Sequence, residues 1–446
     1  MKPAYERPIL VRHTTGLMNK YARVASLQPQ AEIDGVPVAE LLETYGSPLF
    51  VFSERTLRER YRALHDALAR RWPRVRLAWS YKTNYLDGVC RVFHQEGAWA
   101  EVVSGMELEK AVANGVDPAR IHFNGPYKTE ADLRAAFVGG TLVHIDHFDE
   151  MLRAERVAEE LGVRPGVAIR INLAAEGVPP WTRFGFNLES GEALDAVKRL
   201  LAGERLDLVG LHCHLGTFLL QPEAYEVQAR KLAVFANTLR RDLGVRIQVL
   251  DLGGGFASHN ALKAQYLPAE QATPSFERYG DAIARGLAEL DVPPRERPVL
   301  VMEHGRALVD DAGYLLTTVH ASKRLPDGRR ALVLDAGVNV LFTSFWYRHD
   351  VLPTRHIPGI PEPTVLFGPL CMNIDVVRDQ LLLPPVEVGE PLVLRNVGAY
   401  NVTQWMQFIT YRPAVVMVGP NGQHGLLRRR EDLESLRGHE SVPPWL

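Results

Sequence analysis

The chain has 446 residues, of which 46% are hydrophobic and 23% are charged, and its formal net charge is −2. These are the values of an ordinary globular protein long enough for two domains, and they give no reason to expect a nucleic acid or a membrane surface as partner. The first residues lack the apolar core of a signal peptide, and no apolar run approaches the length of a membrane span. Three widely spaced cysteines argue against a disulfide framework, so we expect a cytoplasmic protein.

The first predicted elements are short. Residues 32–46 predict a strand, a turn and a helix that ends at Gly46, and residues 48–53 (PLFVFS) predict a compact apolar strand. Residues 56–72 have the spacing of an amphipathic helix. In residues 75–82, large apolar side chains alternate with smaller or polar ones, which indicates a strand with Lys82 at its C-terminal end.

A repeating order of strands and helices begins with this stretch. The predicted strands cover residues 75–82, 99–104, 120–124, 141–146, 167–172, 208–214, 247–252 and 298–303. Helical patterns separate them, and eight strands alternating with helices favour a (β/α)8 TIM-like barrel over an open doubly wound sheet.

The rhythm stops after the eighth strand. The rest of the chain has strand-like runs broken by Pro and Gly, with almost no helical periodicity, which predicts a second, mainly β domain. We therefore expect three parts: residues 1–53 as an N-terminal segment that contributes to the β domain, residues 54–306 as the barrel, and residues 307–446 as a β-barrel domain.

Lys82 is the first candidate functional residue. The C-terminal ends of parallel barrel strands are where such folds carry out chemistry. A partly desolvated lysine there is expected to lose some preference for its ammonium form, which frees the amine to form a Schiff base. Taken alone, this stretch is explained more simply by a solvated lysine in a surface ion pair.

Other strand ends add to this candidate. Gly253, Gly254 and Gly255 follow the seventh strand, where a tight backbone turn can present N–H groups to a phosphate, although a lone run of three glycines is often only a turn. Glu303 and Arg306 follow the eighth strand in the motif EHGR.

The motif LHCHLGT in the sixth strand places His212 and His214 on one face. Such a pair could bind a metal in a hydrolase, but no companion ligands are evident, so we expect no metal site. The other use of His214 is to stack on a planar ring. A Schiff-base lysine, a phosphate cradle, a stacking histidine and a carboxylate such as Glu303 together suit pyridoxal 5'-phosphate, whose ring accepts the electron pair left when a bond at Cα breaks.

These residues lie in a series of motifs that resembles a known family. The chain is similar to the fold-type III pyridoxal-phosphate-dependent decarboxylases, above all the diaminopimelate decarboxylases, and also the ornithine and arginine decarboxylases. The matching motifs, in order, are YKTN (81–84), EVVSGMEL (101–108), HCHLGT (212–217), DLGGGF (251–256), EHGR (303–306), FGPLCMNID (367–375) and VGAY (397–400). The resemblance implies an alanine racemase-like barrel, pyridoxal phosphate as cofactor and an amino acid as substrate.

The resemblance also implies roles for single residues. Lys82 would form the internal aldimine, His214 would stack on the ring and Glu303 would face the pyridine nitrogen. The residues that would contact the phosphate are Thr217, Gly253, Gly254, Gly255, Gly305 and Tyr400. Arg306 matches an arginine that meets the phosphate or the substrate carboxylate.

The substrate side is implied in the same way, with Tyr347, Met372 and Asp375 as substrate residues beside Arg306. Cys371 matches the cysteine that protonates Cα after carbon dioxide leaves, and in the family this cysteine enters from the partner subunit. A head-to-tail homodimer with shared sites is therefore expected. Without its motif, Cys371 would be interpreted as a buried small hydrophobic residue.

Some positions depart from the family pattern. His304 stands where proline is usual and Glu101 where aspartate is usual. Met372 replaces a glutamate, and Thr343 and Ser344 replace an arginine–proline pair.

The last two departures concern the substrate, because that glutamate and arginine meet the charged distal end of diaminopimelate in the family. We therefore predict a substrate with a less charged distal end, or a conjugate extending past Met372. The alternative is a genuine meso-diaminopimelate decarboxylase of lysine biosynthesis, in which Asn373 or Arg348 rebuilds the distal site.

Two further classes are compared with the decarboxylase. An amino-acid racemase of related fold would be expected to have an arginine where this chain has Glu303. A non-catalytic homologue would be expected to lose Lys82 or Cys371, and both are present. The sequence therefore favours a decarboxylase.

Overall fold

Eight parallel strands close into a barrel in the computed structural model, which describes residues 28–265 and 267–446. Neighbouring strands pair in parallel around the ring, and the pairing of β8 with β10 closes it. All eight predicted strands form. Their bounds are β4 Val75–Ser80, β5 Trp99–Val102, β6 Ile121–Phe123, β7 Leu142–Ile145, β8 Gly166–Asn172, β10 Asp207–His212, β11 Val249–Asp251 and β12 Val299–Met302, and the short β9, Phe186–Asn187, extends β8.

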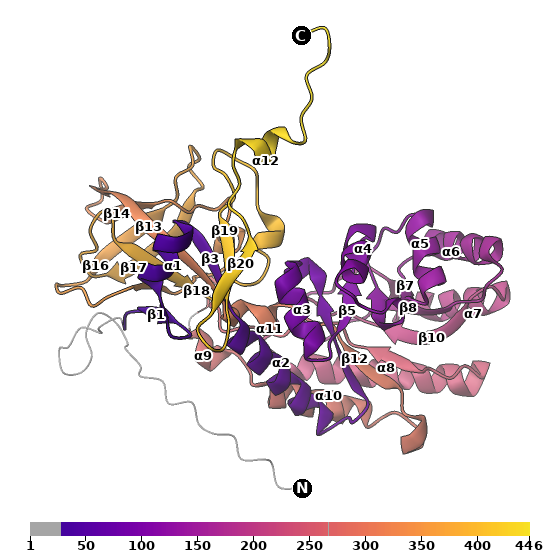
Figure 1. Cartoon of the computed structure of the whole chain (residues 1–446). Coiled ribbons are helices and arrows are strands. Elements are labelled where there is room, and N and C mark those ends of the chain that lie inside the picture. Colours follow the sequence, from indigo (N-terminus) through magenta and orange to yellow (C-terminus); the bar gives the residue numbers. More distant parts are fainter. Residues whose placement is uncertain (1–27, 266) are drawn as a thin grey trace.

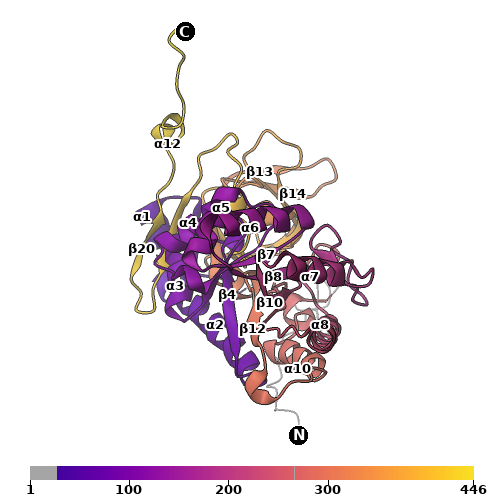
Figure 2. The ribbon, with the colours of Figure 1, turned by 90° about the vertical axis from the view of Figure 1, so that its right-hand side faces the viewer.

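Helices cover the outside of this barrel (Figure 2). Each has one apolar face, which packs on the strands; α2, for example, buries Leu57, Leu64 and Leu68. The helices of the barrel are α2 Glu54–Ala69, α3 Asp87–Gln95, α4 Gly105–Ala113, α5 Glu130–Gly139, α6 Phe148–Leu161, α7 Glu192–Gly203, α8 Pro222–Leu243, α9 Ala269–Ala272, α10 Phe276–Leu287 and α11 Arg306–Val309. None of the helices in the described part of the chain is long and apolar enough to cross a membrane.

The barrel interior has two chemically different layers. Toward the N-terminal ends of the strands, Ala78, Val299 and Val301 form a small apolar cluster that Trp99 and Val249 complete. The next inward positions along the strands, two residues further on, are polar, because side chains on one face of a strand recur every two residues. This alternation places a ring of polar groups directly beneath the C-terminal face.

The second domain is a mixed sheet built around β13, Gly313–Arg324 (Figure 1). Its first half pairs with β3 and β18, and its second half pairs with β14. The other strands are β3 Leu49–Ser53, β14 Arg330–Leu334, β15 Val351–Pro353, β16 Glu362–Phe367, β17 Val376–Leu383, β18 Pro391–Arg395, β19 Ala414–Val418 and β20 His424–Arg428. The predicted combination of an α/β barrel with a mainly β domain is confirmed.

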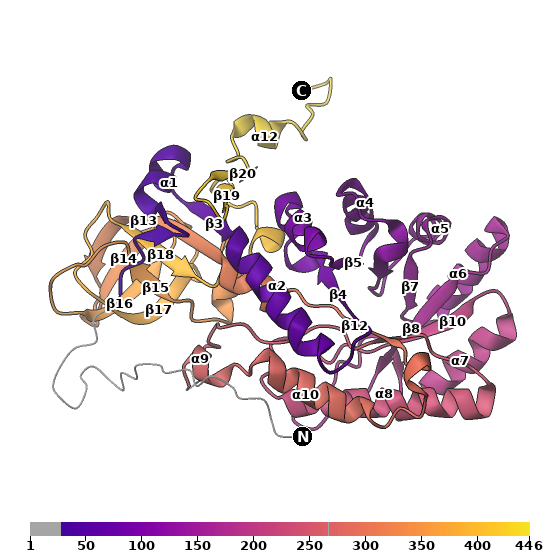
Figure 3. The same ribbon diagram turned by 60° about the horizontal axis from the view of Figure 1, so that its bottom comes forward.

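The early strand β3 lies inside this sheet, between β13 and β19. The predicted N-terminal segment, residues 1–53, is described from residue 28, so its first part lies outside the described residues. Its described part contains β1 Glu32–Ile33, β2 Val36–Pro37 and α1 Val38–Tyr45. Helix α2 then leads from β3 to the first barrel strand (Figure 3). A last short helix, α12 Leu433–Arg437, follows the sheet.

Candidate active site

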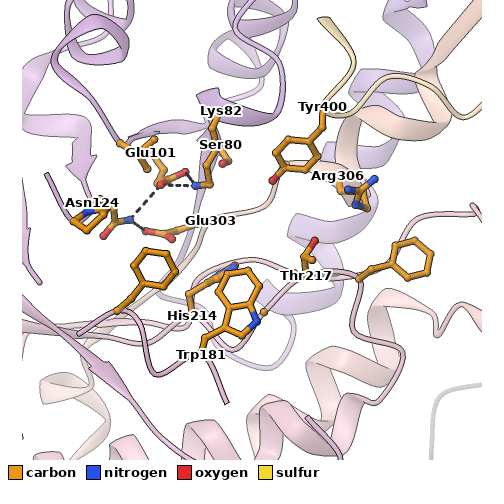
Figure 4. Close-up of a pocket in the computed structure, with 18 of the residues that line it drawn as sticks. Ser80, Lys82, Glu101, Asn124, Trp181, His214, Thr217, Glu303, Arg306 and Tyr400 are labelled. Carbon is orange, nitrogen blue, oxygen red and sulfur yellow. Dashed lines mark hydrogen bonds and ion pairs between the residues drawn. The ribbon is translucent and has the colours of Figure 1, made fainter. Parts of the chain in front are cut away.

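A cavity of about 590 Å³ lies at the C-terminal ends of the barrel strands (Figure 4). Its floor and most of its wall come from the barrel. The β domain supplies the remaining wall through Trp346, Tyr347, Tyr400 and Gln404. The cavity is therefore formed by both domains, and of the site residues predicted from the sequence it brings together Lys82, His214, Thr217, Gly255, Glu303, Gly305, Arg306, Tyr347 and Tyr400.

Lys82 follows β4 in a short 3-10 turn, Tyr81–Thr83, and its amine points into the cavity (Figure 4). Its Nζ donates to both carboxylate oxygens of Glu101 on β5, at 2.7 and 2.6 Å. Burial disfavours the ammonium, but the carboxylates of Glu101 and Glu303 and the nearby Tyr400 side chain outweigh it and raise the pKa of Lys82. Desolvation thus acts on Lys82 as expected, but it does not free the amine, because a carboxylate faces it and raises its pKa overall.

Glu303 directly follows β12 and lies at the bottom of the cavity, only 5% exposed. Asn124 donates its amide N–H to Glu303 Oε1, and His212 Nε2 lies 3.4 Å from Oε2. Burial opposes the charge of Glu303, but His212, His144 and Lys82 favour it and hold its pKa well below the ordinary value. Glu303 is therefore an anion that faces the cavity.

His214 follows β10 and is held by the glycine loop. The backbone N–H of Gly254 donates to His214 Nδ1 at 3.0 Å. Burial, together with the positive charges of Arg170 and Lys82, lowers the pKa of His214 well below its ordinary value, so the ring is neutral. Since Nδ1 accepts a hydrogen bond, Nε2 carries the proton. The indole of Trp181 meets the imidazole edge-on, with ring centroids 5.3 Å apart.

The glycine positions leave no room for side chains. A Cβ at Gly255 would lie 2.3 Å from the Gly216 carbonyl oxygen, and one at Gly305 would lie 1.9 Å from Thr83 Oγ1. Gly255 and Gly305 line the cavity, whereas Gly253 and Gly254 do not. Two of the three loop glycines thus shape the loop, and Gly255 faces the cavity.

Arg306 lies on the same side of the cavity as Tyr400 (Figure 4). Its guanidinium lies 4.7 Å from the ring centre of Tyr347 and 5.0 Å from that of Tyr400, and Nη1 donates to Asp310 at 3.3 Å. Burial disfavours the charge of Arg306, but the nearby side chains of Tyr347, Asp310 and Tyr400 raise its pKa. Its Nε is buried and has no partner among the described residues, so one donor is free for a ligand.

Besides Gly253 and Gly254, three predicted residues do not line the cavity of their own chain. Cys371 is exposed, and Met372 follows it in the same loop. Asp375 is buried and holds this loop instead: its carboxylate accepts the backbone N–H groups of Val338 and Leu370, each at 2.8 Å. Within one chain, the predicted substrate role of Asp375 has no geometric support.

Thr343, which stands at a substrate position of the family pattern, also points away from the cavity. It is 1% exposed, and its hydroxyl contacts Asn401 Oδ1 and His349 Nε2, both at 2.9 Å. A longer charged side chain at this position would be buried between Asn401 and His349. His304 likewise faces away and packs on Phe256, with ring centroids 4.0 Å apart.

Several cavity residues were not predicted as site residues from the sequence. Arg170 is an inward side chain in the middle of the buried strand β8, where its neighbours gave no sign of a cavity. The strand-end position of Asn124 was the only signal for that residue. Gln404 ends a short 3-10 helix, and five further wall residues lie between the regular elements: Trp181, Phe184, Phe218, Leu262 and Trp346.

These features fit pyridoxal phosphate. The cavity offers an amine at one end, a buried carboxylate for the ring nitrogen, and glycine backbone beside Thr217, Tyr400 and the free Nε of Arg306 for a phosphate. The family model described as "Pyridoxal-dependent decarboxylase, pyridoxal binding domain" matches residues 54–310. The chain belongs to this family of pyridoxal-phosphate-dependent amino-acid decarboxylases, and pyridoxal phosphate is its cofactor.

Individual relatives agree with this assignment. The chain is 32% identical over 434 residues to the diaminopimelate decarboxylase of Methanocaldococcus jannaschii, covering 93% of this chain and 95% of the relative. It is also 32% identical to the diaminopimelate decarboxylase of Pseudomonas aeruginosa, covering 92% and 97%. The crystal structure of the M. jannaschii protein in complex with L-lysine superposes with a TM-score of 0.85 at 30% identity, covering 94% of this chain and 99% of that one.

Proposed function

We propose that this enzyme removes the α-carboxylate of an amino acid whose distal end carries less charge than that of diaminopimelate. The observation that supports this substrate class is the composition of the cavity wall. Away from Lys82 and Glu303, the wall is built largely of aromatic and aliphatic side chains: Trp181, Phe184, Phe218, Leu262, Trp346 and Tyr347.

Most of the charges in the cavity have partners within the chain, and the guanidinium of Arg170 lies over the ring of Phe184 with Nη1 3.7 Å from Asp146. Glu101 accepts from Lys82, and Glu303 accepts from Asn124. Arg306 Nη1 donates to Asp310, and its Nε has no partner among the described residues. The distal end of diaminopimelate bears both an ammonium and a carboxylate. Leaving such charges unpaired costs about 2–5 kcal/mol, on the order of 30- to several-thousand-fold in specificity.

The reaction itself places distinct demands on the residues. When bound, pyridoxal phosphate accepts the electron pair released as the bond between Cα and the carboxylate breaks. Lys82 Nζ fixes the cofactor, and Glu101 takes up or returns the amine proton over 2.6–2.7 Å. Glu303 holds a proton at the ring nitrogen, and His214 supports the face of the ring. Thr217, Gly255, Gly305 and Tyr400 hold the phosphate.

The proton that replaces the carboxylate on Cα needs a donor, and we assign it to the Sγ of Cys371. Because Cys371 is exposed and does not line the cavity of its own chain, it acts from a second copy. This assignment supports a homodimer in which each site takes the loop with Cys371 and Met372 from the partner. A substrate that extends past Met372, including a conjugate, would then cross the subunit boundary.

Steady-state kinetics with meso-diaminopimelate, measured beside a panel of amino acids, test the substrate class. We expect kcat/KM for diaminopimelate well below the common enzyme range of about 10⁴ M⁻¹s⁻¹, and a better value for a less charged substrate. A value in that range for diaminopimelate would instead identify a diaminopimelate decarboxylase like the relatives. The Lys82→Ala variant supplies the background rate of carbon dioxide release.

A single substitution tests the charge argument at the loop. Met372→Glu should improve kcat/KM for diaminopimelate, because it adds a carboxylate for the distal ammonium. Asn373→Glu, one residue further along the same loop, is the matched control. Thr343→Arg is not a suitable partner substitution, since it would bury a guanidinium between Asn401 and His349.

A further inference from the structure

The polar layer beneath the cavity contains one imidazole from each of β6, β7 and β10, together with two carboxylates. His122 Nδ1 lies 3.1 Å from His144 Nε2, and the rings of His144 and His212 meet edge to face with centroids 4.9 Å apart. Asp251 lies at the end of β11, and Glu303 follows β12. All five side chains are at most 5% exposed.

The two carboxylates of this layer are close to each other. A carboxylate oxygen of Asp251 lies within 4.8 Å of a carboxylate oxygen of Glu303. Two carboxylates this close in a buried site share a proton, because two like charges repel strongly at low dielectric. One of the pair is therefore neutral.

The surroundings of their oxygens differ. Glu303 Oε1 accepts from Asn124, and Oε2 faces the imidazole of His212, with Nε2 at 3.4 Å but outside hydrogen-bond geometry. Asp251 Oδ1 accepts from the backbone N–H of Gly253 at 2.8 Å. Its other oxygen, Oδ2, has no hydrogen-bond partner among the described residues. A proton on Asp251 Oδ2 turns this unpaired acceptor into a donor.

The electrostatics agree with this placement. Burial and the negative charge of Glu303, with a smaller contribution from Glu101, raise the pKa of Asp251 well above its ordinary value. His122 Nδ1 lies 3.7 Å from Asp251 Oδ2, and burial lowers the pKa of His122 to about 4, so it supplies no positive charge.

We propose that Asp251 is a protonated positioning residue, which leaves Glu303 as the single anion beneath the cofactor ring. This inference rests on the proposed place of Glu303 at the ring nitrogen. If Asp251 were ionised instead, the shared proton would be on Glu303. A neutral Glu303 could not keep the ring nitrogen protonated. Asp251 also fixes Gly253, so the same side chain joins the glycine loop to the floor of the cavity.

The test compares three variants of the holoenzyme. Asp251→Asn is neutral, has the same shape and can still accept from Gly253, so we expect kcat within threefold of wild type. Asp251→Ala removes the donor, and we expect kcat at least tenfold lower with KM changed less than threefold. Glu303→Gln removes the anion, and we expect kcat at least a hundredfold lower with the cofactor still bound. The pH titration of the bound cofactor's absorbance should be the same in Asp251→Asn as in wild type and altered in Asp251→Ala.

Each other result has a definite meaning. If Asp251→Asn loses tenfold or more in kcat while its cofactor stays bound, Asp251 is needed as an anion and the inference is overturned. Wild-type kcat in Asp251→Ala would equally overturn it. If Asp251→Ala does not fold, the infrared band of a protonated carboxyl group, present in wild type and lost in Asp251→Asn, decides. A stoichiometric metal ion in the purified holoenzyme would overturn it, because a cation would keep both carboxylates ionised. Wild-type kcat in Glu303→Gln would refute the proposed role of Glu303 itself.

Discussion

Glu101 holds the ammonium of Lys82 with both of its carboxylate oxygens, at 2.7 and 2.6 Å from Nζ. The register of the barrel explains this contact, because Ser80 on β4 stands opposite Glu101 on β5 and Lys82 follows two residues later. The amine that must bond to the cofactor is thus charged until Glu101 accepts its proton.

Removing this carboxylate should ease the attachment of the cofactor. In Glu101→Gln, the pKa of Lys82 loses its main raising contribution, so apoprotein mixed with pyridoxal phosphate should acquire the absorbance of the attached cofactor at lower pH. An opposite charge at this distance shifts a pKa by about 1–3, and we expect a displacement of the pH profile in that range. Glu101→Asp, which keeps the charge, is the control. Identical profiles for wild type and Glu101→Gln would contradict the argument.

Lys82 itself should be the one lysine that bonds to the cofactor. Borohydride reduction of the holoenzyme followed by peptide mapping should place the label on Lys82, and Lys82→Ala should lose both the label and turnover. Lys128 serves as the internal control, because it is fully buried and its Nζ is paired with Glu150 at 2.8 Å. A label on Lys128, or on any other lysine, would mean that the attachment site is assigned wrongly.

Subunit mixing tests the shared site. Lys82→Ala and Cys371→Ala chains should each be inactive, and after exchange the mixture should regain up to about a quarter of wild-type activity. Random exchange makes half of the dimers mixed, and two-fold symmetry gives each mixed dimer one site with both residues intact. If subunit exchange is demonstrated and activity does not return, Cys371 serves its own chain or takes no part in catalysis.

Glu107 should make the stability of the protein depend on pH. It is 5% exposed, and burial together with the charge of Glu101 raises its pKa from 4.5 to about 7. Because the folded state binds this proton more tightly than the unfolded state, the stability it contributes is complete below pH 4.5 and is lost as the pH rises through 7.

Between pH 5 and pH 8 this loss amounts to about 2–3 kcal/mol in the free energy of unfolding. Glu107→Gln should abolish that part of the pH dependence in denaturant unfolding, since its amide can still accept from the backbone N–H of Val103. Glu109→Gln, an exposed position on the same helix, should leave the wild-type dependence unchanged. An unchanged slope in Glu107→Gln would show that this carboxyl group titrates normally.

The sequence was sufficient to predict the barrel, because each strand carries its own evidence. In β4 the outward Leu77 and Trp79 alternate with the inward Ala78 and Ser80. This alternation is visible in the sequence of the strand itself, because successive side chains of a strand point to opposite faces. The motifs at the strand ends were equally local, so Lys82 and eight other predicted residues do meet in one cavity.

What could not be predicted depends on neighbours across strands or domains. The charge state of Lys82 is set by Glu101 on the next strand. Which of Asp251 and Glu303 carries the proton that they share depends on hydrogen-bond donors from other strands. Thr343 occupies a substrate position in the motif pattern, yet the fold of the β domain turns it toward Asn401. A motif fixes which residue stands at a position, and packing fixes where its side chain points.

The position of β3 sets an order for synthesis on the ribosome. This strand leaves the ribosome before any part of the barrel, but its partners β13 and β19 are translated only after the barrel is complete. The sheet of the β domain can therefore be completed only after the barrel has been synthesised, when β13 and β19 pair with β3. A gene fragment that begins at residue 307 would lack that strand and would expose the edges of β13 and β19, which makes it prone to aggregate rather than to fold.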